Sequence, residues 1–134
     1  LNDSMPEYIA TEVLKLMVQN EIPVKDSKVL MLGITFKENC PDIRNTKAME
    51  VYTCLKNFHM DVDVYDPWAS PDEVKKEYGL AVITSLEGEK YDVIIHTVAH
   101  KEFLELNYKA LKKKKGVIYD VKGSLNVVKV DKRL

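Results

Sequence analysis

The stretch that decides the fold is Ser27–Ile34 (SKVLMLGI) together with the segment that follows it, Thr35–Arg44 (TFKENCPDIR). The first segment is an apolar run of strand length with Gly33 near its end, which is typical of a strand buried on both faces of a sheet. The second segment has neither helical nor strand periodicity, which indicates a loop. A buried strand leading into a polar, charged loop is therefore the starting point for the rest of the chain.

Strand and helix patterns alternate around this stretch. Further strands are expected at 60–65, 80–83, 91–97 and 117–121. Helices are expected from a capping box at Ser4 to about Asn20, from a cap at Asn45 or Thr46 through Leu55, and from a capping box at Ser70 to Tyr78 before Gly79. A helical stretch broken near Asn107 and ending at Gly116 is expected before the last strand, with Lys112–Lys115 as its solvated end.

This alternation predicts an α/β fold. Crossovers of this length favour a small, doubly wound parallel sheet of about five strands, preceded by a helix and covered on both faces. With the predicted strands numbered along the chain, we expect the order 3-2-1-4-5. A ligand crevice is then expected where the first and fourth strands end.

Composition excludes several classes of function. The 134 residues carry 20 basic and 21 acidic side chains and a net charge of −1, which argues against a nucleic-acid groove or a polybasic membrane surface. No apolar run is long enough for a transmembrane helix, and no signal peptide is seen. Two cysteines are too few for a disulfide scaffold, so a cytoplasmic location is expected. Because the first residue is Leu1, we expect a piece of a longer protein.

The loop after the first strand lacks the glycines of a dinucleotide-binding turn. Gly33 stands alone, where G-x-G-x-x-G would let backbone amides approach a pyrophosphate. In their place the loop offers two cations, Lys37 and Arg44, a flat apolar ring, Phe36, and Asp42, which can pair with Arg44 or hold the loop in shape. This composition suits a nucleotide-like anion. The alternative is that the cations are ordinary surface charges and Phe36 belongs to the core.

Other reactive side chains are better explained by structure than by chemistry. Cys40 lies near the two cations, but no base accompanies it, and Cys54 is expected in the core. His96 and His100 straddle a strand end, which does not give helical metal-ligand spacing, so no metal site is expected. We interpret His100 as structural, with a lining role in the crevice as the alternative. Two further assignments are Asp66 as a turn residue and Trp68 as a packing residue.

The loop also carries a resemblance. Gly33–Lys47 (GITFKENCPDIRNTK) resembles the G-x-x-F-K-x-x-x-x-D-x-R-x-S/T segment of the UDP-glucose/GDP-mannose dehydrogenase family, which opens its C-terminal, UDP-sugar-binding domain. Short segments after other strands agree: Tyr65-Asp66-Pro67, His96–His100 and Tyr119–Gly123. The resemblance covers essentially the whole chain and is greatest for the branch that acts on UDP-N-acetylhexosamines.

The resemblance implies a role for each part of the chain. Residues 1–22 would be the end of the interdomain and dimerisation helix, and 23–134 the UDP-sugar-binding domain with a Rossmann-like fold. Phe36 and Lys37 would contact the UDP-sugar, Lys122 would be a basic substrate contact, and Arg44 would reach NAD held by an N-terminal domain absent from this sequence. Family members oxidise the sugar 6-hydroxyl in two NAD-dependent steps on a cysteine that lies upstream. No catalytic residue is therefore expected in this piece, which alone should be inactive, and the uronic-acid product would feed surface polysaccharide synthesis.

Two alternatives belong to other classes. The helical stripe of Ile9, Val13, Leu16 and Met17 could be an association surface, which would make the chain a non-catalytic dimerisation or interaction module. A flavodoxin-like or receiver-like domain would need a hydroxyl-rich phosphate loop or an acidic cluster after the first strand, whereas this loop is basic and aromatic.

Overall fold

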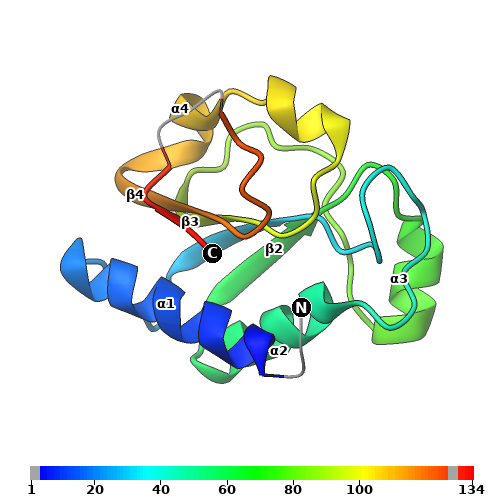
Figure 1. Cartoon of the computed structure of the whole chain (residues 1–134), viewed down its shortest axis with the longest axis horizontal. Helices are drawn as coiled ribbons and strands as arrows, with labels where there is room; N and C mark the ends of the chain where they lie inside the picture. The colour runs from blue at the N-terminus through cyan, green and yellow to red at the C-terminus, as the bar shows by residue number, and fades with distance from the viewer. Residues whose placement is uncertain (1–3, 127–129) are drawn as a thin grey trace.

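A single parallel sheet forms the centre of the computed structural model, which describes residues 4–126 and 130–134 (Figure 1). The strand order is β2-β1-β3-β4-β5, and every neighbouring pair is parallel. The strands are β1 (Lys28–Leu32), β2 (Asp61–Tyr65), β3 (Tyr91–His96), β4 (Lys112–Asp120) and β5 (Lys132–Arg133). The helices are α1 (Met5–Gln19), α2 (Lys47–Asn57), α3 (Pro71–Tyr78), the 3-10 helix η1 (Lys101–Glu105) and α4 (Tyr108–Leu111). This confirms the predicted doubly wound α/β class.

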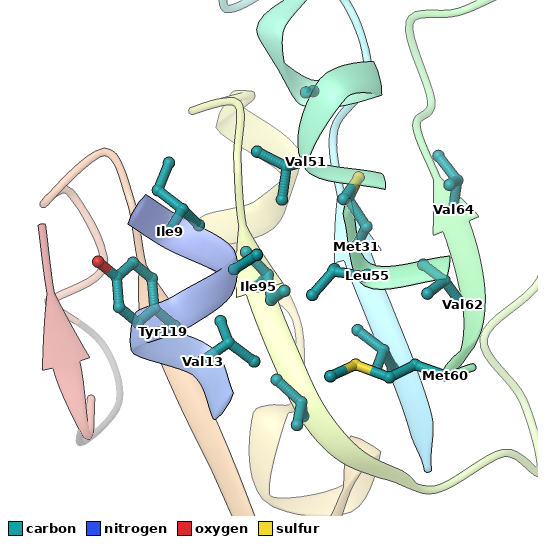
Figure 2. Packing of buried hydrophobic residues seen from close by; sticks show 14 of the residues in the cluster. Ile9, Val13, Met31, Val51, Leu55, Met60, Val62, Val64, Ile95 and Tyr119 are labelled. Atoms are coloured by element: carbon teal, nitrogen blue, oxygen red, sulfur yellow. The ribbon is translucent and has the colours of Figure 1, made fainter. Parts of the chain in front are cut away.

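Helices cover both faces of the sheet, so β1 is buried on both sides (Figure 1). On one face, α1 and α2 pack on alternate strand residues such as Met31, Ile95 and Tyr119, as Figure 2 shows. On the other face, η1 and α4 pack Phe103 and Tyr108 on the intervening residues. The alternation of side chains along a strand divides the core into these two layers.

The helix stripe that could have been an association surface is part of this core. Ile9, Val13 and Met17 are fully buried and Leu16 is 8% exposed. They pack within the same chain against the sheet and α2, so the interpretation of this stripe as an association surface is wrong. Among the described residues, no helix is long and apolar enough to cross a membrane.

Two of the three predicted N-terminal caps are formed. Thr46 accepts a hydrogen bond from the Met49 N–H at the start of α2, and Ser70 accepts one from Glu73 N–H at the start of α3. Gly79 ends α3 in the left-handed conformation, as expected. The predicted capping box of α1 is not formed, because Ser4 itself has helical dihedral angles and its side chain makes no capping hydrogen bond.

Two expectations about the sheet are wrong, and one strand was not predicted. Leu80–Ile83 is not a strand: only Ile83 pairs with Tyr65, because this outermost segment has a partner on one side alone. Lys112–Lys115 is the first half of β4 rather than a helix end: Lys112 pairs with Tyr91 of β3, and the register then shifts, so that the ladder resumes with Val93 opposite Val117. The edge strand β5 has two residues and no sequence pattern that could have revealed it. The spatial order of the predicted segments nevertheless agrees with the order expected, with Ile83 beside β2.

Candidate functional site

The carboxyl ends of four strands lie in one row. Tyr65, Leu32, His96 and Asp120 are paired in register across β2, β1, β3 and β4. The chain runs from β1 to β2 on one side of this row and returns to β3 on the other, so the loops diverge between β1 and β3. A reversal of this kind is where open α/β sheets bind ligands, and it is the crevice position expected from the sequence.

A pocket of about 360 Å³ lies at this reversal. It is lined by the loops after β1, β3 and β4 and by the first turn of α2: Thr35, Phe36, Asn45, Lys47, Ala48, Thr97, Val98 and Lys122. We call it the groove. Two lysines, an aromatic ring and a helix N-terminus converge there, which favours an anion attached to a flat group. A hollow of about 410 Å³ at the opposite edge, lined by Asp26, Lys56, His59, Met60 and Asp61, mixes acidic and basic groups without an aromatic ring.

Gly33 brings the loop after β1 close to Val98, which lines the groove. It has a φ of +104°, and a Cβ at this position would lie 2.5 Å from the Val98 Cβ. The neighbouring Thr97 hydroxyl donates to the carbonyl oxygens of Leu32 and Gly33, at 2.9 and 2.7 Å. The backbones after β1 and β3 can therefore meet only because Gly33 has no side chain.

Asp66, at the end of β2, holds the loop after β1. Its Oδ2 atom accepts from the backbone N–H groups of Ile34 (2.7 Å) and Thr35 (3.2 Å), and its Oδ1 accepts from those of Trp68 (2.8 Å) and Ala69 (3.2 Å). Burial alone would raise the pKa of this carboxyl, but hydrogen bonds from His100 and the backbone outweigh burial and lower the pKa. The interpretation of Asp66 as a turn residue is confirmed, and the carboxylate also joins two loops.

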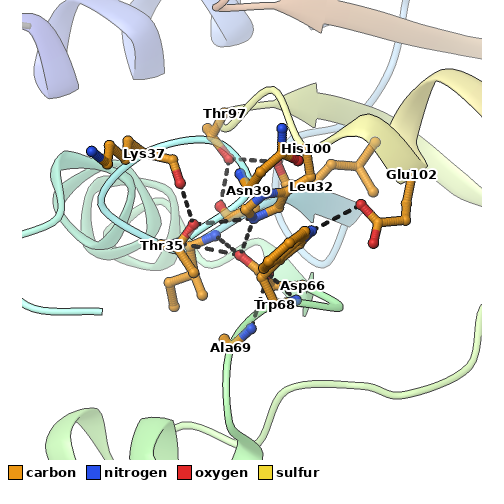
Figure 3. A network of polar contacts seen from close by, with 12 residues as sticks. Leu32, Thr35, Lys37, Asn39, Asp66, Trp68, Ala69, Thr97, His100 and Glu102 are labelled. Atoms are coloured by element: carbon orange, nitrogen blue, oxygen red, sulfur yellow. Dashed lines mark hydrogen bonds and ion pairs between the residues drawn. The ribbon is translucent and has the colours of Figure 1, made fainter. Parts of the chain in front are cut away.

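His100 completes this network, as Figure 3 shows. Its Nδ1 accepts from the Asn39 N–H at 2.9 Å, so the ring proton lies on Nε2. Nε2 then donates to Asp66 Oδ2 at 3.0 Å and lies 3.1 Å from the Thr35 hydroxyl. Trp68 stacks on the imidazole with ring centroids 6.0 Å apart. His100 is buried and structural, and it does not line the groove.

Phe36 and Lys37 come directly after Thr35, a member of this network, in the sequence. The Phe36 side chain is 59% exposed and lines the groove, so the alternative that it belongs to the core is wrong. Its N–H donates to the Asp42 carbonyl at 2.7 Å, which closes the loop. The Lys37 carbonyl accepts from the Thr35 hydroxyl at 3.0 Å, while its exposed ammonium extends away from the His100–Asp66 cluster (Figure 3) and is not part of the groove lining.

Arg44 is also outside the groove lining. Its guanidinium makes two 3.0 Å hydrogen bonds to the Asp42 carboxylate, and its N–H donates a third at the same distance. Hydrogen bonds from the Arg44 side chain and backbone lower the pKa of Asp42 to about 2. The Arg44 side chain is 78% exposed, so the Asp42–Arg44 ion pair is accessible at the surface of the loop. The expectation that Asp42 pairs with Arg44 and shapes the loop is confirmed.

Lys122 comes from the far side of the groove, on the loop after β4. The structure therefore brings Phe36 and Lys122 together across the groove, although 86 positions separate them in the sequence. The other lining residues were not predicted as site residues: Thr35, Asn45, Lys47, Ala48, Thr97 and Val98. The general affinity of a helix N-terminus for anions could have pointed to the start of α2, since its cap was predicted.

The cysteines and histidines supply no reactive cluster. Cys40 and Cys54 are free and half-buried, and burial raises the pKa of the Cys54 thiol, which packs against the core. Among the described residues, no group of three or more His, Cys, Asp or Glu side chains could hold a metal ion.

The groove also fails as a dinucleotide site of the usual kind. The acid that binds a ribose at the end of the second strand in such folds corresponds to Asp66, and this carboxylate is buried and used by four backbone N–H groups and His100. The turn after Gly33 continues with Ile34 and Thr35 and offers no close-approach glycine. These residues do not fit the pyrophosphate and ribose of NAD.

Comparisons with known proteins agree with this geometry. The sequence profile of the UDP-glucose/GDP-mannose dehydrogenase family, UDP binding domain, matches residues 30–127. UDP-N-acetyl-D-glucosamine 6-dehydrogenases of Salmonella typhi and Pseudomonas aeruginosa are 40% and 41% identical over 137 residues. Each alignment covers 100% of this chain and 32% of the relative, so the chain spans about a third of the length of these curated relatives.

Solved structures show the same fold. The crystal structure of NDP-N-acetyl-D-galactosaminuronic acid dehydrogenase from Methanosarcina mazei Go1 matches with a TM-score of 0.78 and 24% identity, and the match covers 96% of this chain and 26% of that one.

Proposed function

The chain belongs to the UDP-glucose/GDP-mannose dehydrogenase family, and on this premise we propose that it is the UDP-sugar-binding domain of an NAD-dependent nucleotide-sugar 6-dehydrogenase. The expected resemblance to the UDP-N-acetylhexosamine branch is confirmed by the relatives at 40% and 41% identity. We therefore propose a UDP-N-acetylhexosamine as the substrate class, with its 6-hydroxyl oxidised to the carboxylate of a uronic acid for surface polysaccharide synthesis.

One observation carries the binding half of this proposal: the groove joins an exposed aromatic ring to two lysines at the reversal point of the sheet. The ring of Phe36 offers a flat surface to a sugar or base, and Lys122 and Lys47 offer charge to a diphosphate. The first turn of α2 adds the positive end of a helix dipole.

Lys37 and Arg44 have separate roles in the proposal. Both side chains are exposed beside the groove rather than in its lining, and so they are available to groups that lie above it. Lys37 would contact the part of the UDP-sugar that protrudes from the groove. Arg44, preorganised by Asp42, would reach the NAD held by another domain, because this chain's own β1 loop does not fit a dinucleotide.

The rest of the enzyme is proposed from the family. The relatives are about three times as long as this chain, which leaves room for an N-terminal domain that binds NAD and carries the catalytic cysteine. We place residues 1–22 as the end of the helix that links the two domains and residues 23–134 as the sugar-nucleotide domain. A cytoplasmic homodimer is the proposed working form, and this piece alone would be inactive.

An NMR titration of the 134-residue chain with UDP tests the binding proposal, because chemical shifts detect weak binding. Saturable shift changes are expected in the groove, and Lys122→Ala is expected to raise Kd about tenfold, since a charge-assisted contact is lost. Lys114→Ala, on the exposed half of β4, is the matched control and should leave Kd unchanged. Equal binding by the Lys122→Ala and Lys114→Ala variants, or no shift changes in the groove, would overturn the proposal.

A further inference from the structure

Asp120, the last residue of β4, is fully buried and surrounded by hydrogen-bond donors. Its Oδ1 accepts from the Gly123 N–H at 3.0 Å and lies 2.8 Å from His96 Nδ1. Its Oδ2 accepts from the Leu125 N–H at 2.8 Å and lies 3.8 Å from Arg133 Nε. One carboxylate therefore fastens the loop after β4 at two points of its backbone.

Lys122 lies inside the segment that Asp120 fastens. The Val121 N–H continues the ladder to the His96 carbonyl at 3.0 Å, and Gly123, with a φ of +70°, turns the chain back toward the carboxylate. The backbone of Lys122 is thus held on both sides by buried contacts, while its side chain is exposed and lines the groove. A long, flexible lysine that is anchored in this way loses less freedom when it meets an anion.

The last strand closes the loop from outside. Arg133 in β5 donates to the Leu125 carbonyl at 2.7 Å while its guanidinium faces the Asp120 carboxylate. The Leu134 N–H also donates to the Asp120 carbonyl at 3.3 Å. These contacts connect the C-terminal strand with the loop that carries Lys122.

We propose that Asp120 and Arg133 are positioning residues that hold Lys122 at the groove, and that they contribute to the binding of a nucleoside diphosphate only through Lys122. Neither residue lines the groove. The ligand in this inference rests on the proposed function, whereas the fastening of the loop does not.

A double-mutant cycle with UDP as the probe tests this inference. Asp120→Asn keeps the shape of the side chain, but whichever way the amide is turned, its NH2 group faces a backbone N–H, that of Gly123 or of Leu125. We expect Asp120→Asn to raise the Kd for UDP about fivefold. In the Lys122→Ala background the same change should have no further effect, since the contact through which Asp120 acts is already gone. An equal loss in both backgrounds would overturn the inference.

Two further variants distinguish a positioning role from a general loss of structure. Asp92→Asn removes a similar carboxylate contact, to the Lys28 N–H at 2.8 Å, at the opposite edge of the sheet, and it should leave Kd unchanged. Should Asp120→Asn not fold, Arg133→Gln serves in the cycle instead, with an expected rise of about twofold to threefold and the same lack of effect beside Lys122→Ala.

A ligand-free measurement distinguishes this inference from the proposed function. Amide order parameters of residues 121–125 should fall in Asp120→Asn and stay unchanged in Asp92→Asn. If wild-type chain does not bind UDP, the proposed function fails, while the order parameters still decide whether Asp120 holds the loop. Unchanged order parameters in Asp120→Asn would overturn the positioning role.

Discussion

Gly33 and Val98 lie so close that a Cβ on Gly33 would stand 2.5 Å from the Val98 Cβ and 2.9 Å from the Val98 backbone nitrogen. The Val98 N–H donates to the Leu32 carbonyl, so neither the backbone at Gly33 nor that at Val98 can move easily. The contact joins the loop after β1 to Val98 in the loop after β3, which lines the groove. The shape of the groove therefore depends on the absence of a side chain at position 33.

Gly33→Ala is expected to destabilise the chain by about 2–4 kcal/mol, through steric overlap added to the strain of a positive φ. Thermal unfolding followed by circular dichroism should show a midpoint lower by roughly 8–15 °C. Gly88→Ala is the matched control, because Gly88 has a φ of +81° and open space around it. A similar, small loss in both variants would show that backbone strain, and not the approach of Val98, limits position 33.

Asp66→Asn is expected to cost about 3 kcal/mol, because an amide cannot accept from donors at both of its ends. Each carboxylate oxygen of Asp66 meets two backbone N–H groups, so one end of the asparagine always faces donors. Urea unfolding at pH 7 measures the loss. Trp68→Phe, which keeps a ring against His100 but loses the hydrogen bond to Glu102, should cost less.

Acid sensitivity follows from the same carboxyl. The folded-state pKa of Asp66 is lowered, so its contribution to stability is complete above the unfolded value of 3.8 and is lost as the pH falls through the folded value. Asp66→Asn should therefore have a smaller stability difference between pH 7 and pH 2 than the wild-type chain. Parallel curves for the two proteins would contradict the assignment.

His96 also makes the folded chain less stable as the pH falls, in the same direction as Asp66. Burial lowers the pKa of its imidazole below the usual 6.5, despite the neighbouring Asp120 carboxylate. Below pH 6.5 the unfolded chain binds more protons than the folded chain, so the free energy of unfolding falls as the pH is lowered through this range. His96→Gln, which keeps an N–H donor but does not titrate, should flatten this fall. Urea unfolding between pH 7.5 and 5 measures the slope, and an unchanged slope would contradict the burial argument.

The sequence predicted a strand or a helix start correctly where its local pattern and its burial favour the same structure. The run around Val29–Leu32 is apolar on both faces, and the caps at Thr46 and Ser70 are local, so β1 and the starts of α2 and α3 were predicted. Lys112–Lys115 and β5 depend on partners far along the chain, which no local pattern reveals. Lys112 pairs with Tyr91 of β3, and the ladder resumes at Val117 opposite Val93, a register shift that the sequence does not indicate.

In the site too, local patterns identified some residues, whereas roles that depend on contacts distant in the sequence were missed. The loop composition identified Phe36, and the resemblance identified Lys122, and both line the groove. The wider role of Asp66 was missed, because its hydrogen-bond partners Ile34, Thr35 and His100 come from two other loops and meet only in the folded chain. The positions of Lys37 and Arg44 outside the groove could not be predicted for the same reason.

A crystal structure of the 134-residue chain with UDP tests the central claim most directly. The account predicts density in the groove, with the diphosphate within hydrogen-bonding distance of Lys122 and the flat part of the ligand against Phe36. Density at the opposite edge of the sheet, beside His59 and Asp61, with an empty groove, would contradict it.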